Sequence, residues 1–157
     1  MNANCPCKAT AHQRGIAALE FAIILPFIMI LLAFPLLFGR AFVCYTVARE
    51  AARDAAVYLS TVPKLSLSNS ARTSNEVAVA NSIVAMELAG LYPGPSAPSV
   101  SIQCDGLTCD GFSIPATIRV AIRVNLIDEI FQSFTSSVTG DNGLLLTADI
   151  TMRYVGN

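Results

Sequence analysis

The sequence predicts an α+β protein in which one long N-terminal helix precedes a small domain of one or two helices and a short antiparallel sheet. Three observations support this. Residues 16–38 form an apolar run, residues 39–60 continue with helical periodicity, and two later segments alternate apolar with polar residues. The composition agrees with a membrane-embedded or assembled chain, because 54% of the 157 residues are hydrophobic and only 13% are charged.

The apolar run at residues 16–38 is long enough to cross a lipid bilayer. No charged residue lies between Phe21 and Phe38. As a helix rising about 1.5 Å per residue it reaches about 34 Å, and a hydrocarbon core is about 30 Å thick. Pro26 and Pro35 are expected to kink this helix without excluding it, since neighbouring helices can satisfy the freed carbonyls.

A cleaved secretory signal peptide is the alternative interpretation of this segment. Such a signal has an apolar stretch of about 7–15 residues that ends at a small-residue cleavage site. The apolar run here is longer, and residues 39–59 continue it with helix-forming residues. We therefore expect the hydrophobic helix to be retained.

Glu20 does not suit a simple membrane anchor. A carboxylate within a bilayer is costly and usually marks a partner or a function. A side chain near the interface can instead extend to water. Glu20 alone leaves both interpretations open.

A polar leader precedes the apolar run. Residues 1–15 end in Gly15 and are followed by Ile16 and by Glu20-Phe21. This arrangement resembles a class III, prepilin-type signal, which a membrane aspartic peptidase cuts after the glycine on the cytoplasmic side. In such proteins the hydrophobic helix stays with the mature chain.

Residues 14–59 resemble the TadE-like minor pseudopilins of tight-adherence (Tad, Flp-type) pili. The motifs that carry the resemblance are Arg14-Gly15, Glu20-Phe21, Leu25-Pro26, Phe38-Gly39-Arg40 and the alanine-rich run from Ala48 to Arg53. The resemblance implies a non-enzymatic role in pilus assembly, adherence and biofilm formation. It also implies as partners a prepilin peptidase, other pilin or pseudopilin subunits, inner-membrane Tad components and the lipid bilayer.

The resemblance also implies roles for single residues. Cleavage after Gly15 makes Ile16 the mature N-terminus, and the peptidase recognises Gly15, Ile16, Glu20 and Phe21. The helix assembles with other subunits through Glu20, Pro26, Gly39 and Arg40. Glu20 is then expected to pair with the terminal amine of a neighbouring subunit, because a buried carboxylate gains most from a buried cation.

The charges flanking the apolar run do not settle its orientation. Lys8 and Arg14 precede it, whereas Arg40, Arg49 and Arg53 follow it. By the positive-inside rule, this count of basic residues either places the C-terminal domain in the cytoplasm or favours neither orientation. The resemblance to prepilins places the N-terminus in the cytoplasm and the C-terminal domain in the periplasm. We expect a single-pass protein of a bacterial inner membrane, also able to enter a surface pilus.

Residues 39–60 are expected to extend the helix beyond the lipid. One face carries apolar residues, and Arg49, Glu50, Arg53 and Asp54 lie on another side. The apolar face comprises Phe38, Phe42, Tyr45, Ala48, Ala52, Ala55, Ala56 and Leu59. This face packs either against the protein's own domain or against another subunit.

Residues 61–157 are expected to form the extracytoplasmic domain. A polar linker at residues 61–74 precedes a helix that begins with the capping box Thr73 to Glu76 and ends near Gly90 and Pro93. Its apolar stripe comprises Val77, Ala80, Val84, Leu88 and Leu91.

Alternation predicts about three strands in the same domain. The first begins at Val100 and Ile102, the second covers residues 117–126, and the third covers residues 144–154 after a turn at residues 140–143. A short helix from Asp128 to Phe134 is expected between the last two strands. Its buried residues are expected to be Ile130, Phe131 and Phe134.

The residues offer little chemistry for catalysis. The one histidine, His12, lies in the leader, which argues against histidine-dependent hydrolysis and most zinc sites. Asp128-Glu129 and Asp105 with Asp110 are the closest carboxylate pairs, and we interpret them as solvated surfaces. A net charge of −1 also gives no basic surface for nucleic acid. We expect no catalytic residue, metal or cofactor.

Five cysteines are present. Cys5 and Cys7 belong to the leader, and Cys44 on the helix is expected to be a small buried residue. Cys104 and Cys109 flank a turn-like insert, and a disulfide between them is expected if the domain lies in the periplasm.

Two other functions remain open from the sequence. The first is a membrane-anchored periplasmic scaffold or binding domain that is never processed, and the second is a small membrane-bound enzyme that uses carboxylates. An intact leader would favour the scaffold, and acidic residues gathered in a deep pocket would favour the enzyme.

Overall fold

The computed structural model of the protein describes residues 13–91, 96–129, 131–140 and 142–156. Its elements are α1 (Gln13–Thr61), α2 (Lys64–Leu67), α3 (Ser70–Leu88), β1 (Ser99–Cys104), β2 (Leu107–Thr108), β3 (Thr117–Leu126), α4 (Gln132–Thr139) and β4 (Leu144–Arg153). The predicted α+β class is confirmed. Most of the predicted leader, including Cys5, Cys7 and His12, lies outside the described residues.

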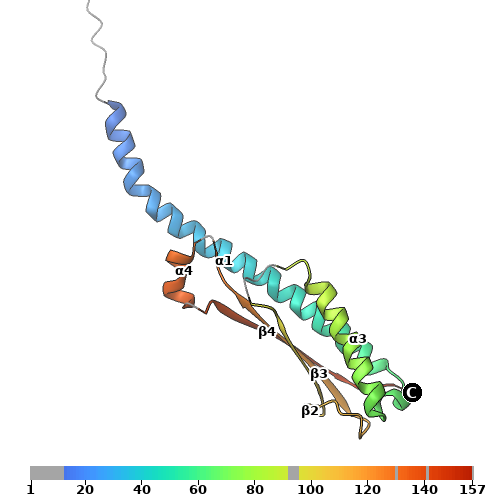
Figure 1. Ribbon diagram of the computed structural model, residues 1–157. Helices are drawn as coiled ribbons and strands as arrows, with labels where there is room; N and C mark the ends of the chain where they lie inside the picture. Colours follow the sequence, from blue (N-terminus) through green and yellow to red (C-terminus); the bar gives the residue numbers. More distant parts are fainter. Residues whose placement is uncertain (1–12, 92–95, 130, 141, 157) are drawn as a thin grey trace, which may run out of the picture.

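Helix α1 divides into two parts (Figure 1). Residues 15–38, which we call the stalk, project from one end of the molecule. The rest of α1 packs against α3, β3 and β4. We call residues 39–156 the head.

Alanines form the face of α1 that packs inside the head. Ala51, Ala52, Ala55 and Ala56 are fully buried, and Leu59 is 1% exposed. Because alanine side chains are short, α3 and the sheet can both approach the helix closely. The sequence left open whether this face covers the head or another subunit, and in the structure the head covers it.

The predicted apolar face is wrong at its N-terminal end. Phe38 and Phe42 are 60% and 68% exposed, and Tyr45 is also exposed. The buried residues at this level are Leu37, Ala41 and Cys44. They continue the line of buried alanines at spacings of three and four, whereas Phe38 and Phe42 each lie about 100° further around the helix.

The sheet has four antiparallel strands in the order β2-β1-β3-β4. Strand β3 lies at its centre, and the even-numbered residues of β3 are buried against the helices. These residues are Ile118, Val120, Ile122, Val124 and Leu126. On the other face, Arg119 Nε donates to both carboxylate oxygens of Asp149 at 2.9 Å. One face is therefore apolar and the other polar, as the alternation predicted.

The expected strands at residues 100–102, 117–126 and 144–154 are present, but the number of strands was underestimated. The additional strand, β2, has two residues and pairs only with β1, where Cys104 lies opposite Leu107. A strand this short carries no periodicity, so the sequence indicated only a turn there.

The predicted start of the second helix is wrong. Helix α3 begins at Ser70, and its N-cap is Asn69, whose side chain accepts hydrogen bonds from Ala71 N and Arg72 N. Thr73 lies inside the helix, where its hydroxyl donates to Ser66 O at 3.1 Å. Asn69 therefore supplies the oxygen that caps the helix, and the linker is shorter than predicted and contains α2. The predicted stripe is confirmed at Ala80, Val84 and Leu88, all buried.

The predicted helix at residues 128–134 is also displaced. Asp128 Oδ1 accepts a hydrogen bond from Phe131 N at 3.1 Å, and α4 begins only at Gln132. This local side-chain bond closes the turn that precedes α4. The predicted burial of Ile130 and Phe134, like residue 141 of the predicted turn, falls outside the part of the structure that can be described.

Carboxylates face one another between α3 and α1. Burial raises the pKa of Glu87, and the neighbouring Asp54 and Glu50 raise this pKa further. A carboxyl whose pKa is higher in the folded head contributes stability at acidic pH, and the contribution is lost as the pH rises through the folded-state pKa.

Glu87→Gln is therefore expected to reduce the loss of head stability as the pH rises above 4.5, the ordinary value for this carboxyl. Denaturant unfolding at a series of pH values measures the effect. Glu129→Gln, at an exposed position, is the control and should leave the profile unchanged. An unchanged profile for Glu87→Gln would contradict the expectation.

Candidate functional site

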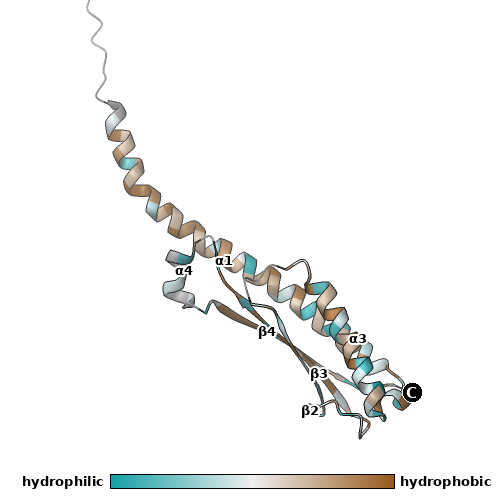
Figure 2. Ribbon diagram, in the orientation of Figure 1, coloured by the Kyte–Doolittle hydropathy of each residue, from teal (hydrophilic) through white to brown (hydrophobic). Residues whose placement is uncertain are grey.

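The stalk exposes most of its apolar side chains, and Ala33 and Leu37 are its buried ones. Figure 2 colours most of the stalk ribbon as hydrophobic. The exposed large hydrophobic residues of the stalk range from 39% exposed at Leu25 to 72% at Leu31. Monomeric soluble proteins rarely expose contiguous apolar patches larger than a few hundred Å². The stalk is therefore a surface that lipid or protein must cover.

Among the described residues, α1 is the one helix long and apolar enough to cross a membrane. It remains helical through Pro26 and Pro35. Each proline removes one backbone donor from the helix ladder. The stalk has the length and surface of a single transmembrane anchor.

Apart from Pro26, which lies within the stalk, the residues with predicted roles in processing and assembly fall into two groups. Gly15, Ile16, Glu20 and Phe21 lie in the first turns of α1, and Ile16, Glu20 and Phe21 are exposed there. Gly39 and Arg40 lie where the stalk enters the head. The groups are about 30 Å apart along the helix, so they do not form one site within a single chain.

The junction of stalk and head contains an apolar groove that sequence reasoning missed. The groove has a volume of 600 Å³ and lies between α1 and β4. Phe38, Phe42 and Tyr45 line one side, and Leu144 and Leu146 line the other. The alternation of β4 predicted an inward face for both leucines, but only the fold brings them beside the exposed aromatic residues of α1.

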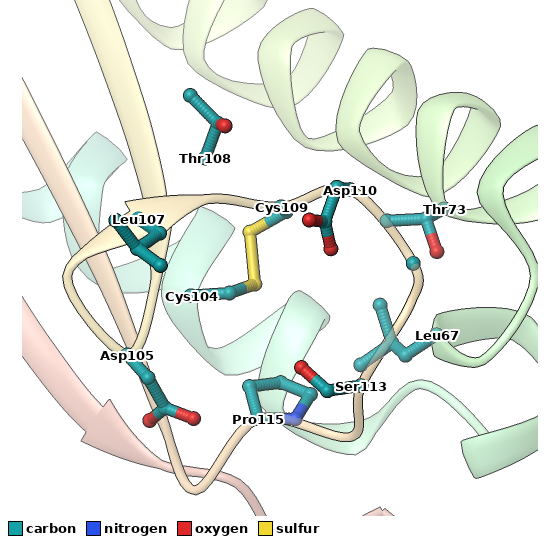
Figure 3. Close-up of a pocket in the computed structure, with 11 residues that line it drawn as sticks. Leu67, Thr73, Cys104, Asp105, Leu107, Thr108, Cys109, Asp110, Ser113 and Pro115 are labelled. Atoms are coloured by element: carbon teal, nitrogen blue, oxygen red, sulfur yellow. A yellow bond between two sulfur atoms is a disulfide. The ribbon is translucent and has the colours of Figure 1, made fainter.

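A disulfide joins Cys104 and Cys109 across the β1–β2 turn (Figure 3). Asp105 in this turn accepts hydrogen bonds from Ala116 N at 2.9 Å and Thr117 N at 2.8 Å. These backbone bonds hold the pKa of Asp105 below its usual value. The turn is thus fixed by a covalent bond and by a carboxylate that ties it to the start of β3.

The pocket beside this disulfide is too small for an organic substrate. Its volume is 80 Å³, whereas pockets for small molecules measure about 300–1,000 Å³. Leu67 and Thr73 from the helices close one side, Asp105 lies on the β1–β2 turn, and Asp110 lies in the loop after β2 (Figure 3). Within the described ranges no three His, Cys, Asp or Glu residues are grouped to hold a metal ion.

Gly111 is where the β2–β3 loop contacts α3. Its φ is +78°, and an added Cβ would lie 2.6 Å from Thr73 Oγ1 and 2.8 Å from the backbone of Asn69. Gly106 has a similar φ of +84°, but its Cβ would have open space. An alanine at either position would therefore have a strained backbone, but only at Gly111 would its Cβ also clash with neighbouring atoms.

Gly111→Ala is expected to destabilise the head by about 1–3 kcal/mol more than Gly106→Ala, because it also forces the loop away from α3. Denaturant unfolding of the two variants measures the difference. Equal losses of stability would show that the contact with α3 is unimportant.

Comparison with known proteins gives one match. A family described as TadE-like protein matches residues 15–57, which is less than half of the chain. Searches of curated proteins and of solved structures each found no match. The matched residues form the stalk and most of the helix inside the head, and this TadE-like segment suggests a role in the assembly of Tad pili.

Proposed function

We propose that the protein is a minor pseudopilin of Tad, Flp-type pili, cut after Gly15 by a prepilin peptidase and assembled through its stalk. The observation that carries this proposal is the overlap of two ranges. The TadE-like match covers residues 15–57, and the stalk, residues 15–38, lies wholly within it. The part of the chain that needs other molecules to cover it thus lies within the part that resembles the family.

The mechanism is packing rather than catalysis. In the membrane, lipid covers the stalk, and in a pilus other subunits replace that lipid. Glu20 is the one acidic residue of the stalk. A carboxylate in an apolar environment is strongly stabilised by a cation held at a fixed position, so Glu20 favours an ordered contact between helices. Cleavage after Gly15 would create such a cation, the terminal amine of Ile16.

The head is proposed to lie on the periplasmic side of the inner membrane, with residues 1–15 in the cytoplasm. The Cys104–Cys109 disulfide supports this orientation, because disulfides persist in the periplasm and are rare in the cytoplasm. The partners are then the prepilin peptidase, other pilin or pseudopilin subunits, and the inner-membrane components of the Tad machine.

Substitution of Gly15 tests the proposal. In a piliated bacterium that carries the chain as its only copy, Gly15→Leu is expected to block cleavage and to abolish surface pili. Gly90→Leu is the matched control, because a side chain at Gly90 meets nothing within 4 Å. Sheared pili are counted by electron microscopy. Normal piliation with the leader uncut would favour the anchored scaffold instead.

A further inference from the structure

The seam between α1 and β4 changes in polarity along its length. At the stalk end it forms the groove at the junction, which is lined by uncharged residues, among them Phe42 and Leu146. Further along the same two elements lies a cavity of 440 Å³. This cavity is lined by Thr46, Arg49, Glu50, Arg53, Ile150 and Met152. The seam is therefore apolar beside the stalk and charged farther into the head.

The outer face of β4 changes in the same direction. Leu145, at the stalk end of the strand, is 60% exposed. The later residues of this face are polar or charged, and all are exposed: Thr147, Asp149, Thr151 and Arg153. Leu144 and Leu146, on either side of Leu145, pack against the buried cluster that contains Leu37 and Ala41 of α1. The apolar end of β4 is therefore level with the place where the stalk enters the head.

The length of the uncharged helix sets the height of this end relative to a bilayer. Residues 21–39 carry no charge, and as a helix they rise about 28 Å, close to a hydrocarbon thickness of about 30 Å. The headgroup layer adds about 5–8 Å on each side. Phe42 lies about 5 Å above residue 39, so the groove is at the height of that layer. Arg40 and Glu129 also lie at this end of the head, and a charge is costly in hydrocarbon, so the groove lies no deeper than the headgroups.

We propose that the groove at the junction sits in the headgroup layer of the membrane, where phospholipid fills it and holds the head against the bilayer. This goes beyond the proposed function, because it needs only the stalk as a membrane anchor and concerns the subunit before it enters a fibre. The upper ends of the acyl chains suit Phe42 and Leu146. Tyr45, with its apolar ring and its hydroxyl, belongs to a residue type that is enriched at this level of a bilayer.

The exposed Leu145 favours lipid over a helix of another subunit as the occupant. Leu145 is not among the residues that line the groove. Because side chains alternate along a strand, it points to the opposite face of β4 from Leu144 and Leu146. A helix lying in the groove would cover those two leucines and leave Leu145 in water. A bilayer surface meets the whole stalk end of the head and covers both faces.

Tryptophan fluorescence tests this position, because the sequence contains no tryptophan and each substitution gives a single reporter. Phe42→Trp reports on the groove, and Leu145→Trp reports on the outer face of β4. Phe27→Trp is the matched reporter within the stalk, since Phe27 and Phe42 are both 68% exposed. Phe112→Trp reports on the far end of the head, because Phe112 follows β2 and is 84% exposed (Figure 1).

The full chain is reconstituted at low density in phosphatidylcholine vesicles whose acyl chains carry bromine, a quencher, either near the headgroup or near the chain end. The Phe42→Trp and Leu145→Trp reporters are expected to be quenched more by the shallow bromine, Phe27→Trp more by the deep one, and Phe112→Trp by neither. In the Phe42→Trp background, Leu145→Asp is expected to reduce shallow quenching by about half, since it places a charge against lipid. Thr147→Asp, exposed on the same face but farther from the stalk, is the control and should leave the quenching unchanged.

Unquenched Phe42→Trp and Leu145→Trp reporters beside a quenched Phe27→Trp reporter would overturn the inference, because water would then fill the groove and leave it open to another subunit. Blue-shifted emission from Phe42→Trp that resists both bromines and is lost on dilution with lipid would also overturn it, since a second copy would then be the occupant. Both results leave the proposed function intact, because neither concerns cleavage after Gly15. An unquenched Phe27→Trp reporter would contradict the inference and the proposed function together, since the stalk would not be in lipid.

Discussion

Replacing both Ile24 and Ile28 with arginine is expected to move the protein out of the membrane fraction. The two residues lie in the middle of the stalk, where they are 52% and 44% exposed. An arginine at the centre of a transmembrane helix costs about 2.5–3.5 kcal/mol, so the pair costs about 6 kcal/mol. The fraction of protein that resists extraction by alkaline carbonate measures the effect.

The matched control is the pair Val57→Arg and Val79→Arg. Both valines are 42% exposed, so their exposure is similar to that of the stalk residues, but they lie in the head. This variant is expected to stay in the membrane fraction. If both pairs behave alike, the stalk is not the anchor.

Ile122→Ala is expected to destabilise the head by about 2–5 kcal/mol. Ile122 is fully buried at the centre of β3, where it lies opposite Ala148 of β4. The substitution removes buried apolar volume and leaves a cavity that the surrounding alanines of α1 are too short to fill. Denaturant unfolding of the full chain in detergent, followed by near-ultraviolet circular dichroism, measures the loss.

Ile114→Ala makes the same chemical change at a residue that is 50% exposed. It is expected to change stability by less than about 0.5 kcal/mol. Comparable losses for both variants would mean that the packing of β3 against α1 does not stabilise the head.

The sequence was most informative where a pattern extends over many residues. The apolar stalk and the alternation of β3 and β4 each continue for ten residues or more, so the expected elements agree with the structure. The sequence was least informative where a single side chain determines the residue at which a helix begins. Asn69 caps α3 in place of Thr73, and Asp128 closes a turn before α4 where a helix was expected. Which side chain does so depends on which side-chain oxygen can reach an unbonded backbone N–H group once the chain has folded.

One part of the candidate site could be predicted from the sequence, and the groove at the junction could not. The predicted processing residues lie together in one short stretch, so sequence was enough to group them. The groove at the junction combines Phe42 of α1 with Leu144 of β4, about a hundred positions later. No local pattern connects these residues. The exposed side of the helix near Phe42 was missed for the same reason, since only the packed head shows which side is covered.

The mass of the intact polypeptide recovered from the membrane fraction is the most direct test that the hydrophobic helix stays joined to the head. A chain that begins at Ile16 and continues through Cys109 into the C-terminal strand is the expected product. A freely soluble head that has lost residues 16–38 would contradict this interpretation.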